Sequence, residues 1–548
     1  MRTKRDLNNV SSLGNVYSLT QADSDSDHEE APNTYADAVK SEEWRKSMRA
    51  EVKALVNRGC WRVVPTPSGV RLIKSKYVYK IKRDWNNKII KRKSRLVVQG
   101  FSQVEGKDYG ETYAPVAKGT TFRLMLALAK VYNLYIHQLD VDSAFPYADL
   151  DEDVFMTPVP GMDIREGYCL KLLKSLYGLK QAPRNWNKNI VTYIKSLGFK
   201  QCVLDNCLFV KHHGEEIYLI SLYVDDILIA GSDLSVIESI KREFTIMYEM
   251  KDLGELNHYL GMKVTRTAEY ISVDQKSYIN DILKKYAELV EEAGNREYST
   301  PMERDLKLRK NEHMTQKQLN YVHAFPYQNI IGALLYLSIN TRPDISYSVG
   351  VLARYCVSPT YRACKAIIRI LSYLRSTIDV DIKFRAESLN ILGYSDADWA
   401  GDLDSRRSTT GYVVYAGGGP IAWQSKLQPT VAASTMEAEY MAAFFAIQEL
   451  VWVKGVLSEL GIDLVDRTTL MMDAQSAISL AKNPTHHKRS KHIDIKYHWL
   501  REHTCEDGDV DLVHCATGNM DADLLTKALP FDPAVTHTRN VAGNGDLR

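Results

Sequence analysis

Three aspartates in the first half of the chain stand where a carboxylate is costly. Asp140 ends an apolar run with the alternation of a β-strand, and Asp225-Asp226 lie between two further apolar runs. Aspartate is depleted in strands, and a buried carboxylate is unfavourable unless it is paired or binds a metal. Three such groups predict a site for two Mg²⁺ ions, which can clamp the attacking and the leaving oxygens of a phosphoryl transfer. The alternative is that Asp225-Asp226 only forms a hairpin turn and that Asp140 only caps a strand.

Four further acids are spaced along the last third of the chain. They stand at the ends of predicted strands and the starts of predicted helices: Asp396, Glu439, Asp473 and Asp523. Such positions can converge at one edge of a sheet, where four carboxylates would hold two Mg²⁺ or Mn²⁺ ions and activate water for phosphodiester hydrolysis. The alternative for any single acid is a helix cap or a surface charge. Three neighbouring acids compete for the same assignments: Asp398, Glu437 and Asp521.

Residues 71–95 form a basic segment that contains a single acid, Asp84, with Tyr77, Tyr79 and Trp85 interleaved. Lys and Arg release the counterions of a phosphate backbone, and aromatic rings stack on bases. The segment therefore suits a nucleic acid, and the alternative is a hairpin with a solvated, charged face. The net charge of the whole chain, +2, favours neither interpretation.

Length and composition restrict the class of protein. A chain of 548 residues is expected to form roughly two to four domains. Its 45% apolar and 25% charged residues are ordinary for a soluble globular protein. No apolar run reaches the roughly 18 residues that a membrane span requires. No secretory signal is recognised, and the 8 scattered cysteines contain no CxxC pair, which indicates reduced thiols inside a cell.

The elements that would position these residues follow from apolar periodicity. Residues 1–40 are polar and partly acidic and are predicted to be a disordered leader, after which Ser41 begins a helix. Residues 327–376 are predicted to be helical. From residue 386 the predicted order is strand, hairpin, long helix, strand, two helices, strand and final helix, which gives a mixed sheet with helices packed on it. Residues 531–548 carry no periodic signal. Earlier strands are predicted at 77–82, 88–90, 95–98, 134–141, 217–224 and 227–230.

The local sequences around these acids resemble a known family. Residues 223–226, Tyr-Val-Asp-Asp, match the YxDD signature of reverse transcriptases, and their surroundings are similar to the Ty1/copia class of LTR retrotransposons. Six pieces occur in the family's order: 95–97, 138–141, 175–184, 223–226, 250–254 and 259–262. The last third resembles the copia-type ribonuclease H through these strings: 394–401, 408–412, 437–440, 491–494 and 522–527.

The resemblance implies an α+β multidomain protein. A right-hand polymerase with fingers, palm and thumb would be followed by a ribonuclease H-like α/β domain. The implied parts are a leader at 1–40, fingers and palm at 41–300, thumb or connection at 301–385, the ribonuclease H-like domain at 386–530 and a tail at 531–548. Protease and integrase lie upstream in the family and are not recognised here, so the chain is expected to be a fragment, a processed product or a decayed copy.

The resemblance also implies roles for single residues. The metal ligands of polymerisation would be Asp140, Asp225 and Asp226, and those of the nuclease Asp396, Glu439, Asp473 and Asp523. Phe145 would be an aromatic steric gate against a ribose 2′-hydroxyl. Contacts with nucleotide or template are expected from Lys82, Arg95, Gly178, Gln181 and Tyr223, and Lys251 would protonate the leaving pyrophosphate. For these supporting residues a surface or packing role is the alternative.

The implied function is an RNA-directed DNA polymerase with ribonuclease H activity on RNA/DNA hybrids, serving retrotransposon replication. Its ligands would be an RNA template, a DNA primer, an RNA/DNA hybrid, dNTPs and two Mg²⁺ ions per active site, or Mn²⁺. Its protein partner would be a second copy of the chain or an integrase. No membrane is expected as a partner. The expected place is inside the cell, in cytoplasmic virus-like particles and the nucleus.

Two other functions stay open at this point. A catalytically inactive relic that only binds nucleic acid is favoured by Pro146, because proline removes a backbone donor directly after the gate position and could displace Phe145. The presence of all seven metal ligands argues against the relic. A DNA-templated repair polymerase is the third hypothesis, and it leaves the second set of acids unexplained.

Overall fold

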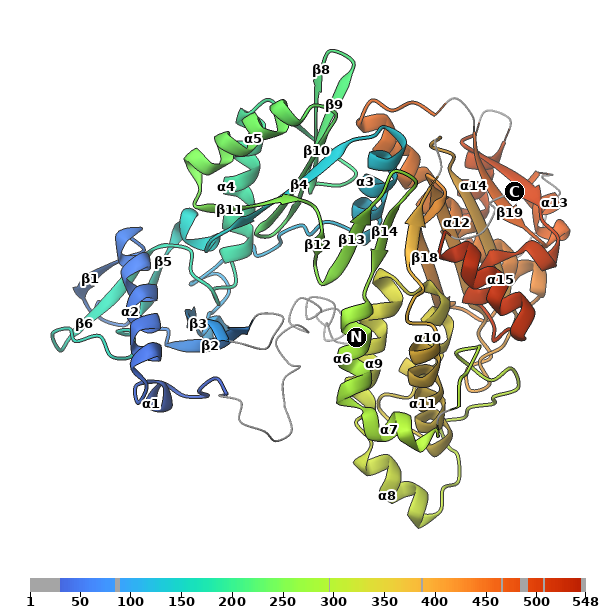
Figure 1. Cartoon of the computed structure of the whole chain (residues 1–548), viewed down its shortest axis with the longest axis horizontal. Helices are drawn as coiled ribbons and strands as arrows, with labels where there is room; N and C mark the ends of the chain where they lie inside the picture. The colour runs from blue at the N-terminus through green and yellow to red at the C-terminus, as the bar shows by residue number, and fades with distance from the viewer. Residues whose placement is uncertain are drawn as a thin grey trace.

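The computed structural model describes residues 30–83, 89–294, 296–385, 388–464, 467–482, 491–505 and 508–543. The predicted leader up to residue 29, part of the basic segment (84–88) and the end of the predicted tail (544–548) lie outside the described residues. Figure 1 shows, from left to right, a β-rich lobe that contains the first described residues (blue), a central sheet flanked by helices, and a stack of helices beside a second large sheet. The predicted α+β multidomain class is confirmed.

The N-terminal lobe combines a small sheet, a two-stranded ribbon and two helices. Its elements are α1 (Tyr35–Ala38), α2 (Glu42–Asn57), β1 (Trp61–Pro65), β2 (Ser75–Arg83), β3 (Ile89–Val98), η2 (Gly100–Ser102), β5 (Asp149–Met156) and β6 (Tyr168–Lys174). The small sheet has the order β1-β6-β5, and β2 pairs with β3. The helix predicted from Ser41 is confirmed as α2, which packs on β3. Its Trp44 meets the ring of Tyr79 edge-on, with centroids 5.3 Å apart.

Part of the predicted leader is folded. Ala38 in α1 is fully buried, and the ring of Tyr35 stacks on that of Tyr77 with centroids 6.1 Å apart. A helix of four residues is too short to have a periodic apolar pattern, so the sequence does not signal it. The folded chain therefore begins before Ser41.

The central unit is a six-stranded antiparallel sheet with helices on both faces. Its elements are α3 (Gly119–Val131), β4 (Tyr135–Val141), α4 (Ala182–Ser196), β7 (Lys200–Gln201), β8 (Leu208–His213), β9 (Glu216–Tyr223), β10 (Asp226–Gly231), α5 (Leu234–Met247) and β11 (Met250–Glu255). The strand order is β11-β4-β10-β9-β8-β7. Along β10, Ile227 and Ile229 share a core with α4 and α5, whereas Leu228 and Ala230 share a core with α3. The predicted strands at 134–141, 217–224 and 227–230 are confirmed, and the unit is the expected palm.

A helical unit follows and is joined to the palm by a small four-stranded sheet. The elements are β12 (His258–Tyr259), β13 (Met262–Arg266), β14 (Ile271–Asp274), α6 (Lys276–Lys285), α7 (Ala287–Glu292), α8 (Gln316–Ala324), α9 (Tyr327–Asn340), η4 (Pro343–Ile345), α10 (Ser346–Ala353), α11 (Tyr361–Ser376) and β15 (Ile382–Phe384). The helices predicted within 327–376 are confirmed. The boundary predicted at residue 301 lies too late, because Ile279 and Ile282 of α6 pack in the same core as Leu371 of α11.

The last unit is a five-stranded mixed sheet. Its elements are β16 (Leu392–Asp398), β17 (Thr409–Ala416), β18 (Gly419–Leu427), α12 (Thr435–Glu459), β19 (Thr468–Met472), α13 (Gln475–Lys482), α14 (Lys491–Thr504), β20 (Val510–His514), η5 (Thr517–Asn519), η6 (Asp521–Leu525) and α15 (Phe531–Val541). The order is β18-β17-β16-β19-β20, with β16 antiparallel to β17 and parallel to β19. The predicted ribonuclease H-like arrangement is confirmed. The tail predicted without periodic structure contains α15, whose pattern Pro533 and several polar residues obscure.

Helix α12 is the one described helix that is long and apolar enough to cross a membrane, by length and composition alone. In this fold it lies across β16 and β17. Ala442, Ala446 and Leu450 on its inner face are fully buried. The apolar composition of α12 is therefore accounted for by its place in a protein core.

The palm and the ribonuclease H-like domain share one hydrophobic core, because α3 packs on β18. A second contact joins α12 to the turn between β7 and β8. The carboxylate of Glu459 accepts hydrogen bonds from the backbone N–H groups of Val203 and Leu204, at 2.8 and 3.3 Å. The indole N–H of Trp452 donates to the carbonyl oxygen of Leu204 at 3.1 Å. The two domains are thus packed directly on one another.

Arg123 of α3 is buried where palm, helical unit and ribonuclease H-like domain meet. Its Nε donates to the carbonyl oxygen of Ile421 in β18 at 2.7 Å, and its Nη1 donates to those of Ile339 and Asn340 at the end of α9, at 3.2 and 3.1 Å. The guanidinium carbon lies 4.1 Å from the ring centroid of Trp423. Burial lowers the pKa of Arg123. The carbonyls at a helix end carry negative partial charge, so they solvate the cation in place of water.

Replacing Arg123 by Met should destabilise this junction. The variant removes the donor of three carbonyl oxygens, of which that of Ile421 lies in a buried contact, and this should lower the free energy of unfolding by about 3 kcal/mol. Chemical denaturation followed by tryptophan fluorescence measures the change. Arg49→Met, at a largely exposed side chain of α2, is the control and should change stability by less than about 0.5 kcal/mol. Similar stabilities for the two variants would contradict the role given to Arg123.

Candidate active sites

The acids predicted for polymerisation converge at one end of the palm sheet. Asp226 begins β10 and is the ladder partner of Asp140 in β4, and Asp225 stands in the tight turn before it. Val224 in the same turn has a φ of 56°, a left-handed conformation that is unusual for a β-branched residue. The indole N–H of buried Trp186 donates to the carbonyl oxygen of Val224 at 2.6 Å. Strain of this kind persists where surrounding contacts fix it. The turn therefore holds Asp225 at the end of the sheet.

The three carboxylates are crowded in a half-buried place. Burial raises the pKa of Asp226 to about 6, and the charges of Asp225 and Asp140 add to the effect. Burial and the charge of Asp140 also raise the pKa of Asp225. Gln138 donates to Oδ1 of Asp226 at 3.0 Å. Like charges directly opposite one another across a ladder repel, and three hard oxygen donors suit Mg²⁺ or Mn²⁺. The donor set therefore fits the metal ions implied by the sequence.

Lys251 lies beside these acids. Its strand β11 pairs with β4, with Lys251 opposite Asp140. Its Nζ is 2.5 Å from Oδ1 of Asp142 and 3.5 Å from Oδ2 of Asp140. Burial disfavours the charged ammonium, but the hydrogen bond and charge of Asp142 outweigh it and raise the pKa of Lys251. Asp142 is not among the residues predicted from the sequence, although its spacing of two residues from Asp140 indicates that the two side chains point to the same side of the strand.

An aromatic stack lies next to the acids. The ring of Phe145 packs against that of Tyr177 with centroids 4.4 Å apart. The guanidinium carbon of Arg95 lies 3.7 Å from the centroid of Tyr177. The charges of Arg95 and Asp225 both act on the Tyr177 hydroxyl, whose pKa burial raises to about 12. Tyr177 is a candidate site residue that the sequence analysis misses, although it lies within the family-like string 175–184.

Pro146 is accommodated without loss of a needed hydrogen bond. It follows Phe145 in the short helix η3 (Phe145–Tyr147), in the first turn of a helix, where a backbone N–H has no helical partner. The turn is closed instead by the backbone N–H groups of Tyr147 and Ala148, which donate to the carbonyls of Ala144 and Phe145 at 3.2 and 3.0 Å. The geometry therefore gives no support to a displaced gate.

Gly178 and Gln181 lie at the seam between ribbon and palm. Gly178 has a φ of 96°, and a Cβ there would lie 1.9 Å from the carbonyl oxygen of Val98, so only glycine fits. The side chain of Gln181 is 1% exposed. Its amide accepts a hydrogen bond from Gln103 at 3.0 Å and donates to the carbonyl of Asp108 at 2.9 Å. The predicted contact of Gln181 with nucleotide or template is corrected to a packing role, because its polar atoms are bonded inside the protein.

The basic segment forms the ribbon β2-β3 in front of the palm acids. Lys82 is exposed on β2. Lys93 and Arg95 alternate with buried residues along β3, and the charges of both lower the pKa of Asp225. Lys93 is not among the predicted residues, and its spacing of two from Arg95 is the signal that could have found it. Tyr223 is half-buried at the end of β9, beside the turn.

The second set of acids forms a tight cluster. Asp396 lies within β16, Glu439 in the second turn of α12, Asp473 directly after β19, and Asp523 in η6. Ligand oxygens of Asp396, Asp473 and Asp523 all lie within 4.8 Å of one another. Glu439 adjoins them, because the charges of Asp396 and Asp473 act on its carboxyl. The structure thus brings together all four acids chosen from the sequence.

The three competing acids have other surroundings. Asp521 is buried and accepts hydrogen bonds from the hydroxyl of Tyr415 at 2.9 Å and the amide of Asn540 at 2.8 Å. Glu437 accepts a hydrogen bond from the backbone that precedes α12. Asp398 lies at the edge of the cluster, where burial and then the charge of a cluster acid raise its pKa. The side-chain oxygens of Asp521 are thus engaged within the protein.

Burial disfavours the charged form of the carboxyl groups in this cluster. It raises the pKa of Glu439 to about 9 and that of Asp523 to about 7, and the charge of Asp396 adds to both. Among the described residues, Oε2 of Glu439 is buried without a hydrogen-bond partner. An unpartnered buried carboxylate oxygen beside three other carboxylates fits a divalent cation with oxygen ligands.

Thr526 and Lys527 complete the cluster, and the sequence analysis assigns a role to neither. Thr526 is fully buried, and its hydroxyl donates to Oδ2 of Asp396. The ammonium of Lys527 lies 2.8 Å from Oδ1 of Asp523 and 3.7 Å from Oδ2 of Asp396. The available signal is the spacing of three and four residues from Asp523, which brings side chains to one side of a helical turn.

Known proteins resemble the chain over most of its length. Residues 58–304 match a family model described as Reverse transcriptase (RNA-dependent DNA polymerase). The chain is 39% identical over 491 residues to the retrovirus-related Pol polyprotein from transposon TNT 1-94 of Nicotiana tabacum, an alignment that covers 88% of this chain and 36% of that protein. A transposon Ty5-1 protein of Saccharomyces cerevisiae is 31% identical over 316 residues, which cover 57% of this chain and 100% of that protein.

The chain spans about a third of the length of several curated Pol polyproteins that it matches, 36% of one and 34% of two others. Among solved structures, a foamy viral protease-reverse transcriptase in complex with double-stranded DNA is 13% identical, with a TM-score of 0.48 over 86% of this chain and 70% of that one. A ribonuclease H1 isolated from compost is 18% identical, with a TM-score of 0.20 over 25% of this chain and 92% of that one. The fold assignment therefore rests on the strand orders described above.

The raised pKa values make the metal-free protein less stable as pH rises. Folded Glu439 and Asp523 keep their protons up to about pH 9 and 7, whereas ordinary carboxyls lose them at 4.5 and 3.8. The folded state binds more protons between these values, so the free energy of unfolding should fall by up to about 1.4 kcal/mol per pH unit and group. Thermal unfolding in EDTA as a function of pH measures the slope.

Glu439→Gln should flatten this slope, because the variant has no ionisable group at that position. In the unmodified chain, added Mg²⁺ should reverse the fall in stability with rising pH, since a cation binds the ionised carboxylates and stabilises the folded state. Glu437→Gln, on the same helix but outside the cluster, is the control and should keep the slope of the unmodified chain. An unchanged slope in Glu439→Gln would contradict the assignment of Glu439 to the cluster of acids.

Proposed function

The chain belongs to the reverse transcriptase family of copia-type retrotransposon Pol polyproteins, and from this premise we propose that it copies an RNA template into DNA and cuts the RNA strand of the resulting hybrid. The chain spans about a third of its long relatives, so both activities are proposals for this chain. The observation that carries the polymerase activity is the register that sets Asp140 opposite Asp226, with Asp225 beside them on a strained turn. The nuclease activity rests on the cluster that Asp396, Asp473 and Asp523 form.

In polymerisation Asp140, Asp225 and Asp226 would hold two divalent cations. Such cations, when bound, stabilise the attacking 3′-oxygen of the primer and the leaving pyrophosphate. The protein's own contribution is orientation, because the ladder and the turn fix the carboxylates before substrate arrives. Lys93 and Arg95 face the same place from the ribbon and supply positive charge to the triphosphate.

Lys251 is the proton donor to the leaving pyrophosphate in this proposal. Its ammonium is held beside Asp142 and Asp140, at the end of the sheet where the reaction takes place. Its raised pKa keeps it protonated at neutral pH, and a donor must lie within reach of the group that it protonates. The contact with Asp142 sets the direction of the side chain.

Phe145 is the gate that selects deoxynucleotides. Its ring lies against Tyr177, which is in turn covered by the guanidinium of Arg95. A ring that is backed in this way cannot easily move aside, so a ribose 2′-hydroxyl would meet it. Discrimination of this kind depends on van der Waals contact and on how far the pocket can relax.

In the nuclease site Asp396, Glu439, Asp473 and Asp523 would hold the cations. Such cations, when bound, activate water for attack on a phosphodiester of the RNA strand. Thr526 fixes one oxygen of Asp396 by hydrogen bonding, which leaves its second oxygen for the site. The buried, unpartnered oxygen of Glu439 is the second feature of the cluster that supports this proposal.

The substrates proposed are an RNA template with a DNA primer, dNTPs and an RNA/DNA hybrid. The exposed ribbon, with Lys82 on its surface, offers phosphate contacts that carry no base specificity. An integrase or a second copy as protein partner, and action in cytoplasmic virus-like particles and the nucleus, are proposals that rest on the family alone.

Separate variants should remove the two activities independently. Asp225→Asn should lower extension of a DNA primer on an RNA template by more than about a hundredfold, because even loss of a residue that only supports a metal ligand costs 10–100-fold. It should leave cleavage of a preformed RNA/DNA hybrid near its initial rate. Asp473→Asn should lower cleavage of the hybrid and leave primer extension near its initial rate. Labelled primer and labelled RNA in one Mg²⁺ reaction report both activities.

Two results would contradict this proposal. Binding of primer–template by gel shift without extension or cleavage in the unmodified chain would favour the inactive relic. Extension on a DNA template with none on RNA would favour the repair polymerase. Asp398→Asn, at the edge of the nuclease cluster, is the matched control and should affect cleavage far less than Asp473→Asn.

Phe145→Ala should weaken sugar selection. Removing the ring takes away the contact that rejects the 2′-hydroxyl, so incorporation of ribonucleotides relative to deoxynucleotides should rise roughly tenfold or more. Single-nucleotide extension with dNTP and rNTP series measures the ratio of kcat/KM values. Phe145→Tyr keeps the ring and should keep the ratio. Equal ratios for Phe145→Ala and the unmodified chain would remove Phe145 from the role of gate.

A further inference from the structure

The nuclease cluster contains a cation of the protein's own. The ammonium of Lys527 lies 2.8 Å from Asp523 and 3.7 Å from Asp396. Within the described residues, both ion pairs that the four cluster acids form are made by Lys527. Its charge also acts on Glu439 and Asp473. One lysine therefore faces all four acids.

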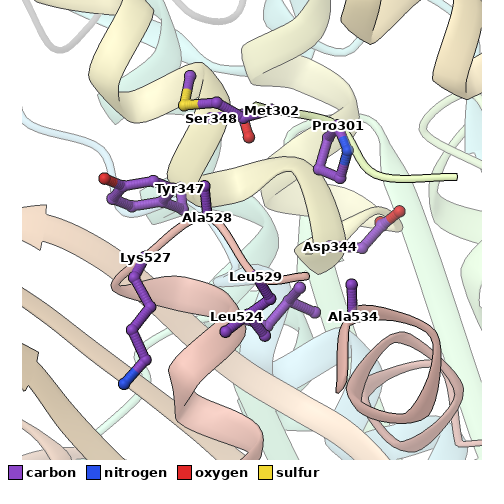
Figure 2. A pocket seen from close by; sticks show the side chains of 10 residues that line it. All are labelled: Pro301, Met302, Asp344, Tyr347, Ser348, Leu524, Lys527, Ala528, Leu529 and Ala534. Carbon is purple, nitrogen blue, oxygen red and sulfur yellow. The ribbon is translucent and has the colours of Figure 1, made fainter. Parts of the chain in front are cut away.

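The backbone that carries Lys527 is firmly held. Its N–H and that of Thr526 both donate to the carbonyl oxygen of Asp523 at 3.2 Å. Thr526 is fully buried against Asp396. On the other side, Leu524 and the residues after Lys527 line a small cavity of about 10 Å³ with the start of α10. Figure 2 shows the ammonium of Lys527 pointing away from the other labelled side chains.

The side chain of Lys527 can nevertheless move away from the acids into solvent. It is 40% exposed, whereas those of Asp396 and Asp523 are 4% and 6% exposed. A lysine stem has four rotatable bonds and a strongly hydrated head group, so the ammonium can turn to solvent while the backbone stays in place. Lys527 is thus a tethered cation, because its backbone is fixed while its head group can move.

We propose that Lys527 is a tethered counter-cation that competes with divalent cations for the nuclease cluster. This inference rests on the proposed nuclease function. When all four carboxylates are ionised they carry a charge of about −4, which two divalent cations balance without any lysine. The ammonium holds Asp396 and Asp523 together when divalent cations are scarce. It turns away when the second divalent cation binds, and it weakens that binding by like-charge repulsion.

Calorimetric titration with Mg²⁺ tests the proposal. The full chain is used in an Asp225→Asn, Asp226→Asn background, so that the heat reports the nuclease cluster. In that background Lys527→Met should bind its weaker Mg²⁺ about tenfold more tightly, because one competing charge is gone. Lys527→Arg keeps the charge and should keep the affinity of the background chain. Lys426→Met, at an exposed lysine of β18, is the surface control and should also leave the affinity unchanged.

A second readout is thermal stability without divalent cations. In EDTA, Lys527→Met should unfold at a lower temperature than the background chain, and saturating Mg²⁺ should remove the difference. Equal Mg²⁺ affinity of Lys527→Met and the background chain, with clear binding in both, would overturn the tethered counter-cation alone. Heats in the background chain that Asp396→Asn does not change would overturn the proposed nuclease site itself.

Discussion

Arg123 carries a positive charge into the place where palm, helical unit and ribonuclease H-like domain meet. Backbone carbonyls of β18 and α9 and the ring of Trp423 take the place of water around it. A buried cation tolerates little displacement, because each lost hydrogen bond leaves both a charge and a carbonyl unsatisfied. The sheet that carries Asp140 and the sheet that carries Asp396 are for this reason parts of one body, with α3 shared between their cores.

Both sites are built from crowded carboxylates, but they differ in the number of basic side chains nearby. Each brings carboxylates from separate strands so close together that burial and mutual repulsion raise their pKa values. Around the palm acids, Lys251, Lys93 and Arg95 supply positive charge from two sides. The nuclease acids are more deeply buried and face Lys527. The polymerase function proposed for the palm requires a site that admits a negatively charged triphosphate, and the more basic surroundings of the palm acids fit this requirement.

Strong local signals account for most of what the sequence could predict. Apolar, β-rich runs bounded by acids identified β4, β9 and β10. The family-like strings, rather than any physical pattern, selected Asp396, Glu439 and Asp523 over the acids next to them. Long-range packing accounts for the rest. The burial of Gln181 depends on partners 73–78 residues away, and the stack of Tyr177 on Phe145 depends on how two loops meet. The helix α6 joins the core of the helical unit through contacts with α11 that no local sequence pattern indicates.

The shared core also sets an order of events during protein synthesis. Arg123 and Ile421 are 298 residues apart, so at roughly 5–20 residues per second α3 leaves the ribosome roughly 15–60 seconds before β18. During that time Leu124 and Leu128, each 1% exposed in the finished protein, lack part of their cover. The palm reaches its final packing only when the last third of the chain has been made. A nascent chain that stops before β18 therefore yields an incomplete palm with an apolar helix exposed, rather than a free polymerase.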